Sequence, residues 1–203
     1  ILESGLVFKQ YPCCGGVHSL LDNMIGLRQK EALKANEVRE IECRLHPSRI
    51  AYLDRPQASE SLEAKFSIQY CVAAALSHGK IGLREFSEES LVQPQTRALM
   101  SKVRISPADD LPGFGSEVIV RKLDGKQVSS RLAEPRGSRN SPFTEDEMLR
   151  KFVDCAMEIM GAAQAEKAGA ALMRLDREDS VENILKLLAP ISPQRSGVTE
   201  HRH

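Results

Sequence analysis

The sequence lacks net charge, a long apolar run and a signal-peptide pattern, and each absence excludes a class of protein. Lys and Arg number 28, as do Asp and Glu, so nothing favours electrostatic binding to a nucleic acid or an anionic membrane. No run approaches the roughly 18 apolar residues of a membrane-spanning helix, and the first residues do not resemble a leader. We therefore expect a cytoplasmic protein with neither a nucleic-acid nor a membrane partner.

The cysteines form no metal-binding or disulfide pattern. They are odd in number and include no C-x-x-C pair, and two of them are neighbours that cannot form an ordinary disulfide with each other. We expect free thiols, a reducing compartment and no structural metal. The five are Cys13, Cys14, Cys43, Cys71 and Cys155.

The composition is that of a globular protein of one domain or two small ones. Of the 203 residues, 41% are apolar and 28% are charged, and no repeat of solenoid length is visible. The sequence opens at Ile1 rather than at a methionine. We expect it to be a fragment of a larger protein.

The front of the chain predicts two helices and a strand. Apolar spacing predicts a helix from Gly16 to about Ala35, and alternation predicts a strand over 37–45 with a one-residue irregularity near Arg39 and Glu40. A second helix is expected over 61–78, closed by a glycine. Its central run is apolar on every side, so this helix is expected to be buried.

The later sequence predicts a sheet and further helices. A helix is expected over 94–102, followed by strands near 103–105, 118–123 and 128–132, the last two joined by an Asp-Gly turn. A capping box at Thr144–Glu147 begins a helical region that continues to Leu188. These patterns predict an α+β fold with a small antiparallel sheet. We assign 1–140 to an α+β domain, 144–190 to C-terminal helices and 191–203 to a flexible tail.

Two segments, 9–18 and 62–70, place polar groups at the starts of helices that enter the core, where burial shifts pKa values. His18 and Asp22 lie one turn apart on one helix face, so either the carboxylate orients the imidazole or the two residues form only a surface pair. Gly15 and Gly16 permit close approach of a ligand, and the helix N-terminus favours a carboxylate.

Each candidate also has a plainer interpretation. Lys9 is either a carboxylate-binding group or an exposed lysine. Lys65 and Gln69, four residues apart on one expected helix face, either line a cleft or form a solvated edge. The thiols of Cys13 and Cys14 are either nucleophiles or small packed groups.

Four segments of the sequence together carry a resemblance to a known family. They are Phe8-Lys-Gln-Tyr-Pro-Cys-Cys-Gly-Gly-Val-His18, Arg49-Ile-Ala-Tyr-Leu-Asp-Arg-Pro56, Glu63-Ala-Lys-Phe-Ser-Ile-Gln-Tyr70, and Glu134-Pro-Arg-Gly137 followed by Lys151-Phe152. With these segments the sequence resembles the second half of the MmgE/PrpD family, in order from about residue 5 to residue 190. That family includes 2-methylcitrate dehydratase, cis-aconitate decarboxylase and iminodisuccinate epimerase.

The resemblance implies a lid-like α+β domain and returning helices that complete an all-helical domain, whose N-terminal part is absent here. It implies an active site between the two domains, with Lys9, His18 and Tyr52 as catalytic residues and Gly15, Gly16, Lys65 and Gln69 near the substrate. The decarboxylase branch carries a histidine near the position of Cys14. This difference favours dehydration or epimerisation over decarboxylation.

We therefore expect a fragment of a cofactor-independent lyase or isomerase that acts on a small di- or tricarboxylate. Alone, the fragment is expected to be inactive. Its wide apolar helix faces exceed what one small sheet covers, so a homo-oligomer is expected. The alternative is a non-catalytic α+β dimerisation or binding module.

Overall fold

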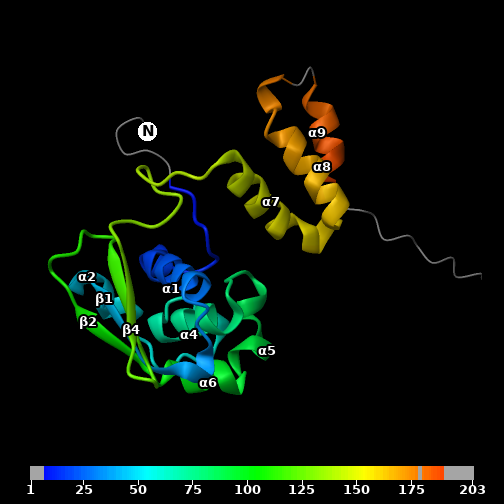
Figure 1. Cartoon of the computed structure of the whole chain (residues 1–203). Helices are drawn as coiled ribbons and strands as arrows, with labels where there is room; N and C mark the ends of the chain where they lie inside the picture. The colour runs from blue at the N-terminus through cyan, green and yellow to red at the C-terminus, as the bar shows by residue number, and fades with distance from the viewer. Residues whose placement is uncertain (1–6, 178–179, 190–203) are drawn as a thin grey trace, which may run out of the picture. The chain divides into compact units, whose positions relative to one another are not determined.

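The computed structural model describes residues 7–177 and 180–189 (Figure 1). The expected tail, 191–203, lies outside the described residues. The chain forms two compact units that divide between Phe143 and Thr144. Each unit is described by itself below.

The first unit is built on a four-stranded sheet with strand order β2-β1-β3-β4. β1 pairs with β3 in antiparallel fashion, and β3 and β4 form the expected hairpin. The α+β class is confirmed, but the expectation of a purely antiparallel sheet is wrong, because β1 and β2 are parallel. Parallel neighbours need a crossover, and the helices between them provide it. The strands are β1 (Val38–Leu45), β2 (Val103–Pro107), β3 (Ser116–Lys122) and β4 (Gln127–Leu132).

The start of β1 has the predicted irregularity. Its pairing with β3 shifts register between Val38 and Glu40, which is a β-bulge in the position that the sequence indicates. After the bulge, the side chains of Ile41, Cys43 and Leu45 are buried. The alternating charged residues lie on the other face of the sheet, so one face is apolar and one is wet.

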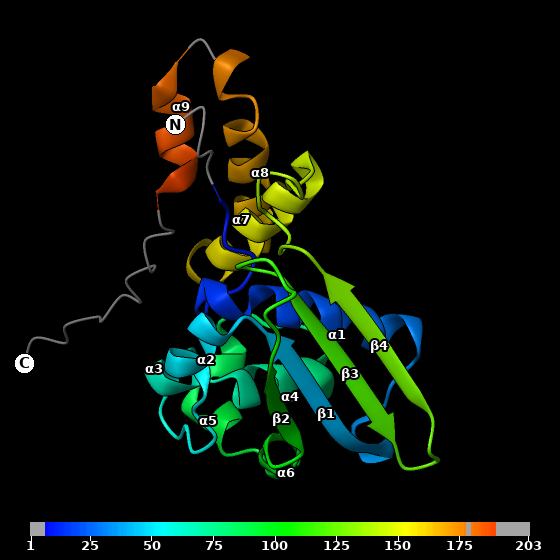
Figure 2. The same cartoon turned by 90° about the vertical axis from the view of Figure 1, so that its left-hand side faces the viewer.

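Two helices cover the apolar face, as Figure 2 shows. α1 (His18–Lys30) follows a 3₁₀ turn, Gly15–Val17, and contacts β3 and β4. α4 (Ile68–His78) contacts α1 and β2, and its residues from Ile68 to Leu76 are all buried. The expectation that this apolar segment is buried is confirmed, and the first unit covers it without a partner chain.

The helix expected over 61–78 is in fact two helices. α3 (Ser61–Ala64) ends before Lys65, and α4 begins at Ile68. The hydroxyl of Ser67 accepts a hydrogen bond from the amide of Tyr70 at 3.1 Å and so caps a new helix. The apolar spacing continues through this break, so periodicity alone did not reveal it.

Short helices complete the crossover between β1 and β2. Pro47 occupies the first turn of α2, which the sequence analysis did not predict, and the His46 side chain caps it by accepting from the Ser48 amide at 3.3 Å. These elements are α2 (Pro47–Leu53), the 3₁₀ turn Arg84–Phe86, α5 (Glu88–Leu91) and α6 (Pro94–Met100). A further 3₁₀ turn, Ala35–Glu37, lies just before β1.

The second unit is helical. The predicted capping box is present: the Thr144 hydroxyl accepts from the Glu147 amide, and the Glu147 carboxylate accepts from the Thr144 amide. Met160 and Ile184 are buried, whereas Met157, Ile159 and Met173 are exposed. The elements are α7 (Glu145–Met160), α8 (Ala162–Leu172), the 3₁₀ turn Leu175–Arg177 and α9 (Val181–Leu188). In the described part of the chain, no helix has the length and apolar character to cross a membrane.

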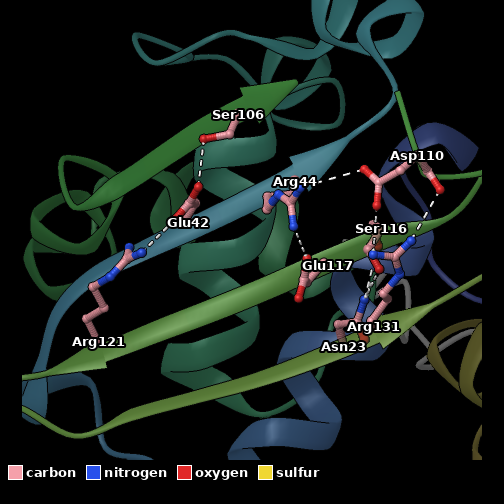
Figure 3. Close-up of polar contacts among 9 residues, drawn as sticks. All are labelled: Asn23, Glu42, Arg44, Ser106, Asp110, Ser116, Glu117, Arg121 and Arg131. Atoms are coloured by element: carbon pink, nitrogen blue, oxygen red, sulfur yellow. Dashed lines mark hydrogen bonds and ion pairs between the residues drawn. The ribbon is translucent and has the colours of Figure 1, made fainter. Parts of the chain in front are cut away.

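Ion pairs link the strands across the wet face of the sheet (Figure 3). Arg121 on β3 donates to Glu42 on β1 at 2.8 Å, and Ser106 on β2 donates to the same carboxylate at 2.9 Å. Arg44 contacts Glu117 at 2.5 Å and Asp110 at 3.6 Å. Asp110 also accepts from Arg131 on β4 at 2.9 Å, so side chains of all four strands take part in these contacts.

Glu42→Gln is expected to remove a pH-dependent contribution to stability. Hydrogen bonds from Arg121 and Ser106 lower the pKa of Glu42, so this carboxylate stabilises the fold above its unfolded pKa and ceases to do so as pH falls through its folded pKa. We expect the variant to be less stable than the parent by about 0.5–1 kcal/mol near pH 7. In acid the two proteins are expected to be equally stable, because the carboxyl of the parent and the amide of the variant are then both uncharged. Urea unfolding at several pH values measures this. Glu60→Gln, at an exposed carboxylate, is the control; an equal effect there would contradict the prediction.

Gly79→Ala is expected to destabilise the first unit by about 1–2 kcal/mol. Gly79 closes α4 with a φ of 74°, and a Cβ there would collide with the guanidinium of Arg28, which donates to the Leu76 carbonyl at 2.9 Å. Gly26→Ala is the matched control, because Gly26 lies inside α1 with open space around it. Alanine there is expected to stabilise the helix by about 0.5–1 kcal/mol. If thermal unfolding ranks the two variants in the opposite order, Gly79 is not required for its positive φ or its close approach to Arg28.

Candidate functional site

The start of α1 is surrounded by ionisable side chains. The Tyr11 hydroxyl donates to Oδ1 of Asp22 at 2.6 Å, and the backbone amide of Arg136 donates to Oδ2 at 2.8 Å. Burial raises the pKa of Asp22, while these two donors oppose the rise. In the described part of the chain, Asp22 accepts from Tyr11 and from the Arg136 amide, and no hydrogen bond joins it to the His18 ring. That Asp22 orients the imidazole stays a prediction.

His18 is a buried imidazole with a free nitrogen. The residue is 3% exposed, and its ring packs edge-on against Tyr11 with 5.2 Å between ring centroids. Nε2 of His18 is buried and has no hydrogen-bond partner among residues 7–177 and 180–189. A buried polar atom without a partner is unfavourable unless another molecule supplies one. This nitrogen can therefore serve a ligand.

The thiol of Cys13 is influenced by both His18 and Lys9. A thiol contact with Cys71 lowers the pKa of Cys13, and a hydrogen bond and positive charge from His18, with the charge of Lys9, act in the same direction against burial. Cys71 is fully buried and its thiol also lies 3.3 Å from the Ala64 carbonyl. Lys9 is itself exposed on the segment before α1. The charges of Lys9 and His18 therefore act on the same thiol.

Gly16 is the point at which α2 meets α1. A Cβ on Gly16 would lie 3.0 Å from the hydroxyl of Tyr52 and 3.0 Å from a methyl of Leu53, so the glycine makes room for α2. A Cβ on Gly15, in contrast, would have no other atom within 4 Å. Burial, followed by the charge of Cys14, raises the pKa of the Tyr52 phenol. Tyr52 therefore lies beside Gly16 and Cys14 rather than at Cys13.

Arg49 fastens the start of α1 to the sheet. It is 3% exposed, donates to the Gly16 carbonyl at 3.0 Å and also donates to the Gly115 carbonyl next to β3. In the described part of the chain it has no carboxylate partner. Its role is structural, and it holds the backbone from which His18 begins α1.

Lys65 and Gln69 do not share a helix face, which corrects the expectation. Lys65 lies in the break between α3 and α4, where its carbonyl accepts from the Cys14 amide at 2.9 Å and its ammonium lies 5.9 Å from the centre of the Phe86 ring. The amide of Gln69 donates to Asp54 at 2.6 Å and accepts from the backbone of Arg55 at 3.2 Å. Gln69 therefore holds the end of α2.

The MmgE/PrpD C-terminal domain family matches residues 11–177. The chain belongs to the MmgE/PrpD family. Cis-aconitate decarboxylase of Homo sapiens is 26% identical over 200 residues, and the match covers 94% of this chain and 41% of that protein. Cis-aconitate decarboxylase of Mus musculus is 23% identical over 202 residues, with 95% and 41% covered. The chain therefore spans about two-fifths of the length of these curated relatives.

Within this MmgE/PrpD domain, the structure adds partners that sequence reasoning missed. The Tyr11–Asp22 hydrogen bond joins residues 11 positions apart, and the Arg49–Gly16 bond joins residues 33 apart. No local spacing signals such pairs. The described residues contain no group of three or more His, Cys, Asp or Glu side chains arranged to hold a metal ion.

Proposed function

We propose that this chain supplies acid-base groups to a cofactor-independent lyase or isomerase that acts on a small di- or tricarboxylate. The observation that carries the proposal is the buried, unpartnered Nε2 of His18 in a domain of the MmgE/PrpD family. The names of the relatives support a carboxylate substrate, since cis-aconitate is a tricarboxylate.

The reaction begins with removal of a proton from the carbon beside a carboxylate. Negative charge then develops next to a group that is already anionic, and nearby cations and backbone N–H groups stabilise it. Under the proposal, Lys9 binds the carboxylate or the developing enolate, and His18 takes or returns the proton through Nε2. We also propose Tyr52 as an acid; its hydroxyl lies beside Gly16, and burial is the main cause that raises its pKa.

Two outcomes follow loss of the proton. Expulsion of a neighbouring hydroxide gives dehydration, and return of the proton to the opposite face gives epimerisation. The family resemblance implies a histidine near the position of Cys14 in the decarboxylase branch, and this chain has a thiol there. We therefore propose dehydration or epimerisation, with 2-methylcitrate as a representative substrate, ahead of decarboxylation.

The proposed active form includes more protein than the first unit. The resemblance implies an all-helical domain, and α7, α8 and α9 are proposed to complete it. Met157, Ile159 and Met173 expose apolar surface in the second unit, which favours association with another helical segment or a second copy of the chain. The 203 residues alone are therefore proposed to be inactive.

Hydrogen exchange in deuterated water tests the function. The natural polypeptide that contains this sequence is incubated with 2-methylcitrate, citrate or cis-aconitate, and NMR follows deuterium at the carbon beside the carboxylate together with product formation. We expect exchange of the substrate hydrogen with dehydration or epimerisation. Release of carbon dioxide from cis-aconitate without such products would replace the proposal with decarboxylation.

The alternative is a non-catalytic module. The exposed apolar residues of the second unit are the observation that favours it. Absence of exchange with every acid, together with a stable dimer of the 203 residues by light scattering, would support this alternative. Turnover by the natural polypeptide would reject it.

A further inference from the structure

A cavity of about 550 Å³ lies at the end of α1 opposite His18. It is open to solvent and is lined by the end of α1, the turn that follows, the end of α4, α6 and the residue before β2. Ligand sites for small molecules have volumes of about 300–1,000 Å³, so the space suits a small organic molecule. The lining residues are Arg28, Leu33, Lys34, Ala35, Asn36, Leu76, Ser77, Gln95, Ala98, Leu99 and Lys102.

The charges of this cavity have one sign. Arg28, Lys34 and Lys102 line it, and none of the lining residues is acidic. The nearest acidic residues in sequence are engaged elsewhere: Glu31 pairs with Lys30 at 3.9 Å, and Glu37 pairs with Lys122 at 3.3 Å. Three cations without a carboxylate, in a protein of zero net charge, leave a local positive potential.

Two of the cations are held in place by backbone carbonyls. Nε of Arg28 donates to the Leu76 carbonyl at 2.9 Å, and its guanidinium lies against Gly79, where any Cβ would displace it. Nζ of Lys102 donates to the Val38 carbonyl at 2.6 Å. Each carbonyl accepts from one N–H group of its cation and carries only a partial negative charge. The other N–H groups of Arg28 and Lys102 and most of their positive charge therefore stay available to a ligand.

The third cation stands free at the rim. Lys34 is exposed, and its ammonium has no ion pair or hydrogen bond within the described ranges 7–177 and 180–189. It follows a turn in which Ala32 adopts a φ of 49°, a conformation that is unfavourable for alanine. The strained turn brings Leu33 into the core, where it is 3% exposed, and places Lys34 at the cavity.

We propose that this cavity binds a small organic anion with two or more negative charges, either a phosphate ester or a polycarboxylate. The three cations supply the charge recognition. Ser77, Asn36 and Gln95 add neutral hydrogen-bonding groups, and the leucines at positions 33, 76 and 99 offer an apolar wall to a carbon skeleton. The site is separate from the His18 cluster, so this inference does not depend on the proposed function.

Calorimetric titration of the chain tests the site. The probes are fructose 1,6-bisphosphate as the phosphate ester, citrate as the polycarboxylate and fructose as the uncharged control. We expect at least one anion to bind with a dissociation constant below about 1 mM, more weakly at high salt, and fructose not to bind. The anion that binds more tightly shows whether the cavity prefers a phosphate ester or a polycarboxylate. Failure of both anions to bind would overturn the proposal.

Variants locate the binding. Lys34→Gln removes the free cation and is expected to weaken binding by at least about fivefold, and Lys34→Gln with Lys102→Gln is expected to abolish it. Lys167→Gln, an exposed lysine of α8 in the second unit, is the matched control and is expected to leave affinity unchanged. Circular dichroism verifies that each variant is folded. Binding that survives the double variant, or that is lost in Lys9→Gln instead, would place the anion elsewhere and overturn the proposal.

Discussion

Arg49→Met is expected to lower the free energy of unfolding of the first unit by about 3 kcal/mol. The guanidinium is buried and bonds the carbonyls of Gly16 and Gly115. Methionine restores the apolar volume but supplies no donor, so two carbonyls lose their partner inside the protein. Relief from burying a charge offsets part of this loss, which is why we expect about 3 kcal/mol rather than the full value of two charge-assisted hydrogen bonds.

Tyrosine fluorescence measures the unfolding of the first unit, which contains Arg49. The sequence has no tryptophan, and its three tyrosines, Tyr11, Tyr52 and Tyr70, all lie in the first unit. Arg49→Lys can reach one carbonyl and is expected to lose about half as much stability. Arg55→Met is the matched control, since among the residues that the structure describes this exposed side chain donates to the Tyr52 carbonyl alone, at 3.3 Å. A loss in Arg49→Met no larger than in Arg55→Met would show that the buried contacts contribute little.

His18→Gln is expected to lower turnover by the natural polypeptide by about 10²–10⁴-fold, the usual range for loss of a general acid or base. Glutamine fills much of the same space and keeps a polar end, but it does not exchange a proton near neutral pH. Because the residue is 3% exposed, tyrosine fluorescence must first show that the variant is folded. The expected loss is in kcat, with a smaller change in KM.

His46→Asn is the control for this experiment. His46 caps α2 by accepting from the Ser48 amide, and asparagine can accept the same hydrogen bond. We expect the activity of this variant to stay within about threefold of the parent, because the His46 side chain caps a helix at the surface and takes no part in the proposed reaction. A His18→Gln variant that is folded and retains parental turnover would remove the imidazole from the mechanism and leave Lys9 and Tyr52 as the groups to test.

Local signals predicted much of the fold. The bulge near Glu40, the Asp-Gly hairpin and the capping box at Thr144 each depend on a few adjacent residues, and each is present. The restart of the helix at Ser67 was missed because apolar residues continue on both sides of it. The parallel pairing of β1 and β2 was missed because alternation shows that a strand exists but not which neighbour it takes.

The candidate site was predicted less completely for the same reason. Lys9 and His18 were predicted as site residues because the segment that holds both resembles a family motif, whereas Cys13 was left open between a nucleophile and a packed thiol. The partners of Asp22 and of Gly16 come from distant segments, and the Arg136–Asp22 bond spans 114 residues. The sequence pattern suggested that His18 was the partner of Asp22, whereas tertiary packing placed the hydroxyl of Tyr11 there.

The position of β1 inside the sheet has a consequence for the order of folding. β3 and β4 are joined by a tight turn and can pair early, whereas β1 meets β3 and β2 only after long loops close, with Glu42 and Arg121 79 residues apart and Glu42 and Ser106 64 residues apart. β2 can join only when the intervening helices have assembled. During synthesis on the ribosome, β1 therefore emerges with both of its edges unpaired and waits for most of the first unit before its backbone amides are protected.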